Sequence, residues 1–141
     1  MRILGIDYGK KRIGLAITST VASMALPLCT IQHKGPIPEA ARLILEQVSK
    51  LKDIEEITIG WPLYMDGTQS PLCAEVLELK KNLELFFNKP IHLVDERLTS
   101  KIAEESFRSV GLSRKGRKDY LDQAAACGIL ETFLQRKKHL G

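Results

Sequence analysis

The apolar residues of the chain fall into short runs that predict β-strands, separated by segments rich in turn-forming or charged residues. Five such runs occur, at residues 2–8, 11–18, 25–31, 57–59 and 91–94. Gly9 and Lys10 leave only a tight turn between the first two runs, so these strands are expected to pair as a hairpin. The fourth run stops at Gly60 and the fifth at the charged residues 95–97. Both later strands are therefore predicted to be short.

Four further segments place apolar residues at helical spacing. They predict α-helices over about 37–51, 71–86, 101–110 and 118–138. Pro36 is suited to open the first of these helices, and Ser70 to cap the second. Gly111 is expected to close the third. Residues 111–118, with the sequence GLSRKGRK, predict a basic and flexible loop before the last helix.

The order of these elements, β-β-β-α-β-α-β-α-α, predicts an α/β fold. The expected sheet is mixed and five-stranded: the first three strands are antiparallel, and βαβ crossovers then add the other two, with helices on both faces. A chain of 141 residues, of which 44% are hydrophobic, is long enough to bury one ordinary core. We therefore expect a single domain over residues 1–141.

Charge and cysteine content narrow the classes of partner. The net charge of +4 and the pI near 9.0 favour an anionic partner, and Lys and Arg outnumber Asp and Glu between Arg97 and Lys118. The three cysteines are widely spaced and form no CxxC pair, which is typical of reduced thiols in a cytoplasmic protein. Asp7 interrupts the first apolar run too early for a signal peptide. The uncharged stretch 13–32 is rich in Ser and Thr, so no membrane partner is expected.

Asp122 occupies an unusual place in the last predicted helix. At about 100° per residue, it shares one stripe with the apolar residues Ala125, Ala126, Ile129 and Phe133. Asp122 is therefore expected on the core-facing side, where small alanines let the helix approach the sheet. An unpaired buried carboxylate is strongly unfavourable, so a cation, a hydrogen-bond donor or a metal must lie beside it.

Two other strand ends also carry acids. Asp7 ends the first strand, and Asp95 and Glu96 follow the fifth. In α/β sheets, ligands gather outside the carboxyl ends of parallel strands. Together with Asp122, these acids predict a shared Mg²⁺ or Mn²⁺ site, because carboxylates suit hard cations and no His/Cys set suits zinc. The surrounding basic residues point to a phosphodiester substrate, and two metal ions could activate water and stabilise the leaving oxygen.

Each acid also has an ordinary structural explanation. A strand-end residue such as Asp7 is often part of a turn. Residues 95–97 can form a solvated loop in which Arg97 pairs with a neighbouring acid. Asp122 can pair with a buried Arg, either Arg12 or Arg97. The sequence alone leaves these alternatives open.

The candidate contacts to nucleic acid also have two interpretations each, one functional and one structural. The basic residues 114–118 are either a phosphate-binding loop or a solvated surface. Trp61 and Tyr64 lie in a turn-rich loop and could stack on bases, although loop aromatics more often pack on their own domain.

Taken together, the sequence resembles the YqgF family, whose members are described as Holliday-junction resolvases and as nucleases of pre-16S ribosomal RNA. Four stretches carry the resemblance, in the family's order and covering nearly the whole chain with the elements between them: GIDYGKKRIGLA, IGWPLYMDGT, VDERLTS and KDYLDQAAACGILETFL. The resemblance implies a ribonuclease-H-like fold. It also implies that Gly9 and Gly14 are backbone requirements of the first hairpin.

Position by position, the resemblance implies the roles of the acids and of several basic residues. Asp7, Glu96 and Asp122 would be the catalytic residues and the ligands of one or two Mg²⁺ or Mn²⁺ ions, with Asp95 as a substitute or helper for Glu96. The cations implied to contact the scissile phosphate or its neighbours are Arg12, Arg97 and Lys118.

The function implied is that of a metal-dependent endonuclease, a hydrolase that cleaves phosphodiester bonds in structured nucleic acid and leaves a 5′-phosphate and a 3′-hydroxyl. We expect it to process the 5′ end of pre-16S ribosomal RNA, with the small-subunit precursor as a partner, and to be a monomer or weak dimer. A symmetric DNA junction would call for paired sites, and the sequence shows no obvious dimerisation device.

Three other functions compete with this one. A Holliday junction resolvase acts on four-way DNA junctions, and a non-catalytic ribosome-assembly or nucleic-acid binder would keep the fold for its basic surface. An ATP-dependent phosphotransferase has a similar first hairpin, but it needs two such domains and a second phosphate loop, for which this chain is too short.

Overall fold

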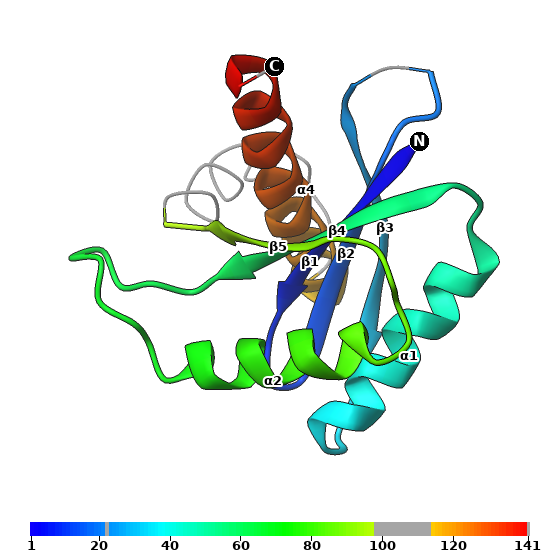
Figure 1. Ribbon diagram of the computed structural model, residues 1–141. Coiled ribbons are helices and arrows are strands. Elements are labelled where there is room, and N and C mark those ends of the chain that lie inside the picture. The colour runs from blue at the N-terminus through cyan, green and yellow to red at the C-terminus, as the bar shows by residue number, and fades with distance from the viewer. Residues whose placement is uncertain (22, 98–113, 141) are drawn as a thin grey trace.

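A mixed five-stranded sheet forms the centre of the molecule, as predicted (Figure 1). The structure is a computed structural model that describes residues 1–21, 23–97 and 114–140. Its strands lie in the order β3-β2-β1-β4-β5, with bounds β1 Arg2–Tyr8, β2 Arg12–Thr18, β3 Ala25–Gln32, β4 Ile54–Trp61 and β5 Ile91–Asp95. Strands β1, β2 and β3 pair antiparallel, whereas β4 pairs parallel to both β1 and β5. The carboxyl ends of β1, β3, β4 and β5 therefore lie along one edge.

Helices cover both faces of this sheet (Figure 1). Helices α1 (Ile37–Lys50) and α2 (Leu72–Glu84) contact each other on one face, and the long helix α4 (Arg114–Leu140) crosses the strands on the other. Alternate residues of each strand pack against the α1/α2 layer and against α4. Leu4 and Ile6 belong to the core beneath α1 and α2, whereas Ile3 packs with Ile129 and Leu130 of α4. This two-layer burial explains why the strands are apolar on both sides.

Strand β4 is longer than the predicted 57–59, because the charges of its first half are compensated. Ile54 and Glu56 already pair with β1. Burial alone would raise the pKa of Glu56, but hydrogen bonds from Lys137 and, at 3.0 Å, from His92 outweigh burial, and the pKa is lowered. A charged residue can thus occupy a central strand when its partners are supplied by other elements.

Two predictions about helix ends are wrong. Ser70 does not cap α2 with its side chain. Its main-chain oxygen accepts from the Cys73 amide at 3.0 Å, while its hydroxyl is buried without a hydrogen-bond partner. Residues 114–118 form the start of α4, not a loop, since Arg and Lys are good helix formers that offset the one glycine, Gly116. The helix predicted over 101–110 lies outside the described residues.

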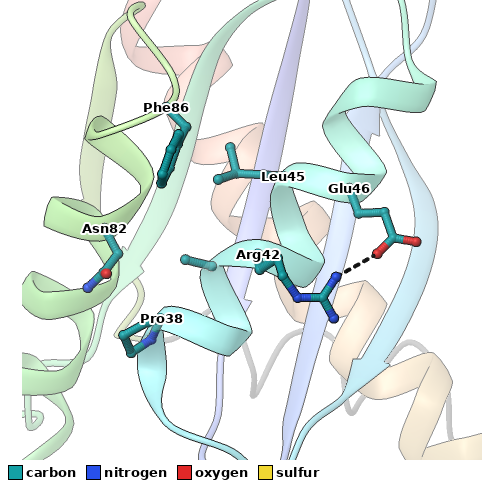
Figure 2. A pocket seen from close by; sticks show the side chains of 7 residues that line it. Pro38, Arg42, Leu45, Glu46, Asn82 and Phe86 are labelled. Atoms are coloured by element: carbon teal, nitrogen blue, oxygen red, sulfur yellow. Dashed lines mark hydrogen bonds and ion pairs between the residues drawn. The ribbon is translucent and has the colours of Figure 1, made fainter.

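The α1/α2 layer is not completely filled. Pro38 and Leu45 of α1 and Phe86, just beyond α2, line a pocket of about 590 Å³, with the Arg42–Glu46 ion pair at its side (Figure 2). Phe86 is 79% exposed because the helix ends at Glu84, so it does not continue the buried face of α2 as predicted. This pocket lies on the opposite side of the sheet from α4. Within the described ranges, no helix is long and apolar enough to cross a membrane.

Candidate active site

Asp7 lies near the carboxyl end of β1 and on the face that α4 covers. Ile3 packs against α4, and the period-two alternation of a strand places Asp7 on that same face. The pKa of Asp7 is raised well above its usual range, first by burial, then by the negative charge of Glu96 and a hydrogen bond with it, and last by the charge of Asp122. Asp7 is therefore the centre of a group of acids, as predicted.

Glu96 follows the last residue of β5 and faces Asp7. Its main-chain nitrogen donates to the carbonyl of Trp61 at 3.4 Å, which holds it against the end of β4. Its pKa is raised mainly by burial and also by the charge of Asp95, while the hydrogen bond with Asp7 acts in the opposite direction. That combination is expected when a protonated Asp7 donates and Glu96 accepts. The two carboxyls thus share a proton.

The neighbouring acid, Asp95, has a different partner. Its carboxylate accepts from the main-chain nitrogen of Arg97 at 3.0 Å and from the Arg97 guanidinium at 2.8 Å. These hydrogen bonds lower the pKa of Asp95. The Arg97 guanidinium also donates to the Met65 carbonyl at 3.4 Å, so it joins the loop after β4 to the end of β5. The structure therefore turns Asp95 toward Arg97 and Glu96 toward Asp7.

Asp122 lies on the sheet-facing side of α4, as the helical periodicity predicted, with Ala126 and Ile129 fully buried further along. Its carboxylate accepts from the Arg12 guanidinium at 2.7 Å. Of the open alternatives for Asp122, pairing with Arg12 is the one that the structure shows. The charge of Asp122 still contributes to the raised pKa of Asp7, so the third acid is close to the other two although it is neutralised by Arg12.

Asp119 is a second partner of Arg12 that was not predicted from the sequence. The Arg12 guanidinium also donates to the Asp119 carboxylate, and Thr30 donates from its hydroxyl to the Asp119 carbonyl at 3.0 Å. The available signal was spacing, because Asp119 precedes Asp122 by three residues and such pairs share a helix face. Arg12 therefore joins β2 to α4 through two carboxylates. Lys118 belongs to α4, but its side chain is outside the described part of the structure.

Two glycines allow these elements to approach so closely. Gly14 pairs with Asp7 across the hairpin, and a Cβ on it would meet the backbone of Asp122 and Gln123. A Cβ on Gly60 would meet the Glu96 carboxylate and, at 2.6 Å, Ile129. Gly14 is therefore required by the approach of α4 and not only by the hairpin turn.

The two aromatic residues of the nearby loop behave differently. Trp61 is half-buried against the core beneath α1 and α2, so its packing role is the one that the structure supports. Tyr64 is 53% exposed. Its loop is ordered by Asp66, whose carboxylate accepts from the amide and hydroxyl of Thr68 at 2.9 and 2.6 Å.

The Asp7–Glu96 pair has the chemistry of a hard-cation site. Its two carboxyls are buried and close together, so desolvation and like-charge repulsion both disfavour their charged forms. A divalent cation would compensate both effects more fully than one proton does. In the described residues, no group of three or more His, Cys, Asp or Glu side chains is arranged to hold a metal ion. The carboxylate of Asp122 is directed to Arg12. Asp7 and Glu96 are therefore suited to bind a cation directly, and Asp122 lies close to them.

Comparisons with known proteins agree with this architecture. The chain is 37% identical over 134 residues to a protein of Syntrophus aciditrophicus and 39% identical over 141 residues to one of Protochlamydia amoebophila, both provisionally named pre-16S rRNA nuclease. The matches cover 95% and 96% of this chain, and 88% and 94% of those relatives.

Solved structures show the same fold at low sequence identity. Thermus thermophilus RuvC in complex with a Holliday junction substrate superposes with a TM-score of 0.59 at 15% identity, covering 97% of this chain and 96% of RuvC. The fowlpox virus Holliday junction resolvase superposes with a TM-score of 0.60 at 11% identity, covering 96% and 99%. The predicted ribonuclease-H-like fold is confirmed.

The family model described as RuvX, Holliday junction resolvase, matches residues 1–136. The four motifs read from the sequence therefore identified the family correctly, and the chain belongs to the RuvX (YqgF) family.

Proposed function

We propose that the protein is a divalent-metal-dependent endonuclease that hydrolyses phosphodiester bonds, with Asp7 and Glu96 holding Mg²⁺ or Mn²⁺ and Asp122 acting as the third acid. The observation that carries the proposal is the buried Asp7–Glu96 pair at the carboxyl edge of the sheet. Two buried carboxyls whose pKa values are both raised, in a place where ligands of α/β proteins gather, are typical of a functional site.

The chain's own residues prepare this edge for a phosphodiester. Asp7 and Glu96 lose their shared proton when they hold a cation, and two carboxylates then face the reacting phosphate. A bound divalent ion would activate the attacking water and neutralise charge on the phosphate. Arg12 orients Asp122 beside Asp7, and Arg97 holds Asp95 away from the pair. Further donors of Arg12 and Arg97, and Lys118, are proposed to contact substrate phosphates.

We propose pre-16S ribosomal RNA, at its 5′ end, as the substrate, and the small-subunit precursor as the physiological partner. Relatives with 34–39% identity over nearly the whole chain bear that name, whereas the superposed resolvases share less than a fifth of their residues with it. All three cysteines are free thiols, which fits action in the cytoplasm. We expect a monomer or a weak dimer.

A second candidate activity is resolution of four-way DNA junctions. The description of the family model favours it. It requires two sites acting together on a symmetric substrate, so it predicts a stable dimer on the junction.

One experiment separates these activities. The purified protein is incubated with Mg²⁺ or Mn²⁺ and either a labelled RNA spanning the 5′ end of the 16S precursor or a labelled four-way DNA junction. Asp7→Asn tests the metal site. Asp53→Asn is the matched control, because it makes the same chemical change at an exposed position whose positive φ of 66° Asn also tolerates.

We expect cleavage of the RNA by the wild type and by Asp53→Asn, and none by Asp7→Asn. If only the junction is cleaved, the substrate is the four-way DNA junction and not the RNA. Cleavage that persists in Asp7→Asn would contradict the proposed site, and no metal-dependent cleavage of either substrate would favour a non-catalytic binder.

A further inference from the structure

A second feature of the same sheet edge is a basic pocket of about 570 Å³ beside the β1–β2 turn. Its lining comes from two segments, residues 10–12 and 32–34, and consists of Lys10, Lys11, Arg12, Gln32, His33 and Lys34. Four of these six residues are cationic and none is acidic. The pocket therefore has the charge of an anion-binding site.

Much of this positive charge is not neutralised by the residues that the structure describes. Arg12 is paired with Asp119 and Asp122 on its inner side. Lys10 has only a loose contact with Glu75, at 3.7 Å, and its side chain is 70% exposed. For Lys11 and Lys34, both exposed, the described part of the chain supplies no carboxylate partner.

The two segments are held together by His33, which is only 7% exposed. Its main-chain nitrogen donates to the Lys11 carbonyl at 3.1 Å, and its Nε2 lies 3.1 Å from the Gly9 carbonyl oxygen. The ring packs against Tyr8, with 6.0 Å between ring centroids. Its Nδ1 is buried without a hydrogen-bond partner. This buried histidine, which has one unused polar atom, holds the base of the pocket in place. The lysines therefore extend from a backbone that is fixed by hydrogen bonds and packing.

The location of the pocket relates it to the acids. Strand β3 runs parallel to β1, since both pair antiparallel with β2, so residues 32–34 leave the sheet at the edge that carries Asp7. Two strand-to-strand steps separate β3 from β1, which corresponds to about 10 Å. Arg12 lines the pocket and also pairs with Asp122, the acid whose charge acts on Asp7. A nucleic-acid strand bound at the acids could continue directly across the pocket.

We propose that the pocket between residues 10–12 and 32–34 is a subsite for a second phosphodiester of the bound nucleic-acid strand, next to the one at Asp7 and Glu96. The inference rests on the proposed function, because binding at the acids is what places the strand on a course toward the pocket. Lys11 and Lys34 supply point charges to the phosphate, and Lys10 leaves its loose contact with Glu75 to join them. Such contacts are made to the sugar-phosphate backbone of the nucleic acid, so the subsite binds RNA or DNA. It positions the strand and confers no sequence preference.

The test uses binding without metal, so that it does not depend on cleavage. Lys11→Gln/Lys34→Gln removes two exposed cations from the pocket. Lys50→Gln/Lys52→Gln is the matched control, since it removes the same charge from exposed positions just before β4, at the opposite edge of the sheet. Affinity for a labelled single-stranded RNA and for a labelled four-way DNA junction is measured in EDTA over a range of salt concentrations, and the unfolding midpoint of each variant verifies its fold.

We expect the pocket variant to bind less tightly and to show a smaller slope of log affinity against log salt, by about 0.7 on single-stranded RNA and about 0.9 on duplex arms for each phosphate that the variant no longer neutralises. The control should retain the wild-type slope. A pocket variant with the slope of the control overturns the subsite, and so does absence of binding to both probes by the folded wild type.

The outcome is separable from that of the proposed function. If the wild type shows no metal-dependent cleavage, the slope still decides whether the pocket binds phosphates. If cleavage exists, the pocket variant should raise KM and leave kcat unchanged, because a remote phosphate contact is equally strong before and during the reaction.

Discussion

Replacing Gly14 by Ala is expected to separate the acids of the site without altering any of them. Gly14 pairs with Asp7, and an added Cβ would lie 3.0 Å from the Gln123 amide nitrogen and well inside that distance from the Asp122 carbonyl oxygen. Ordinary contacts begin at 3.4 Å, so α4 must withdraw by at least 0.4 Å at Gln123 and by more at Asp122. The obstructing atoms are all backbone, and no side-chain rotation can relieve the contact.

The expected magnitude follows from this geometry. Overpacking of a close-packed contact destabilises a protein by about 1–3 kcal/mol. A displacement of about 1 Å at a catalytic group lowers the rate by on the order of 100-fold. Gly14→Ala should therefore lower the free energy of unfolding by about 1–3 kcal/mol and cleavage by on the order of 100-fold, with the three carboxylates intact.

Denaturant unfolding and metal-dependent cleavage of the labelled RNA test this expectation. Gly35→Ala is the matched control, because a Cβ there would meet Glu39 at an ordinary 3.4 Å. The control should retain wild-type stability and activity. If Gly14→Ala retains both as well, α4 does not depend on a glycine at this position and the proposed closeness of Asp7 and Asp122 is refuted. If it loses stability but cleaves normally, Asp122 is not needed where the structure places it.

Three further outcomes are expected. Since the pKa values of Asp7 and Glu96 are raised on folding, the contribution of this pair to the stability of the metal-free protein should be fully present below about pH 4 and should be lost as the pH rises through those raised values. Asp7→Asn should remove this contribution from the pH profile measured by denaturant titration, and an unchanged profile would contradict the coupling. Glu96→Gln should abolish metal-dependent cleavage, while Asp95→Asn, which changes a carboxylate held by Arg97, should keep most of it in the same RNA assay; the reverse order of activities would assign the ligand to Asp95. Neutralising the basic residues of 114–118 should lower the salt-dependence slope by about 0.7–0.9 for each phosphate that the segment ceases to bind, and an unchanged slope would leave that segment a solvated surface.

The fold was largely predictable because its signals are local. Alternation and apolar runs located all five strands, and helical spacing located α1, α2 and the core-facing side of α4. The errors arose where a distant partner overrides the local signal. Glu56 can lie in the first half of β4 because Lys137 forms an ion pair with it and His92 forms a hydrogen bond with it. Ser70 is a local exception, because its main-chain oxygen and not its hydroxyl accepts from the Cys73 amide at the start of α2.

The structure brings together acids that the sequence singled out, but their pairings were not predictable. A carboxylate at a strand end and another in an apolar helix stripe stand out in any sequence, so Asp7 and Asp122 were found without a structure. Whether Asp95 or Glu96 faces Asp7 depends on the turn after β5, and here the family resemblance chose the acid that the structure also brings to Asp7. Asp119 was overlooked because an acid at the polar start of a helix is unremarkable by itself.

The sequence by itself determined the elements, the family and the presence of acids in unfavourable places, because periodicity and motif spacing are properties of neighbouring residues. Only the tertiary structure decided which charges meet. Arg12 and Asp122 are 110 positions apart in the chain, yet lie 2.7 Å apart. That contact exists because Gly14 lets α4 approach the sheet, and the same approach adds the charge of Asp122 to the surroundings of Asp7. Electrostatic pairing depends on distance in space, and distance in space is what folding adds to the sequence.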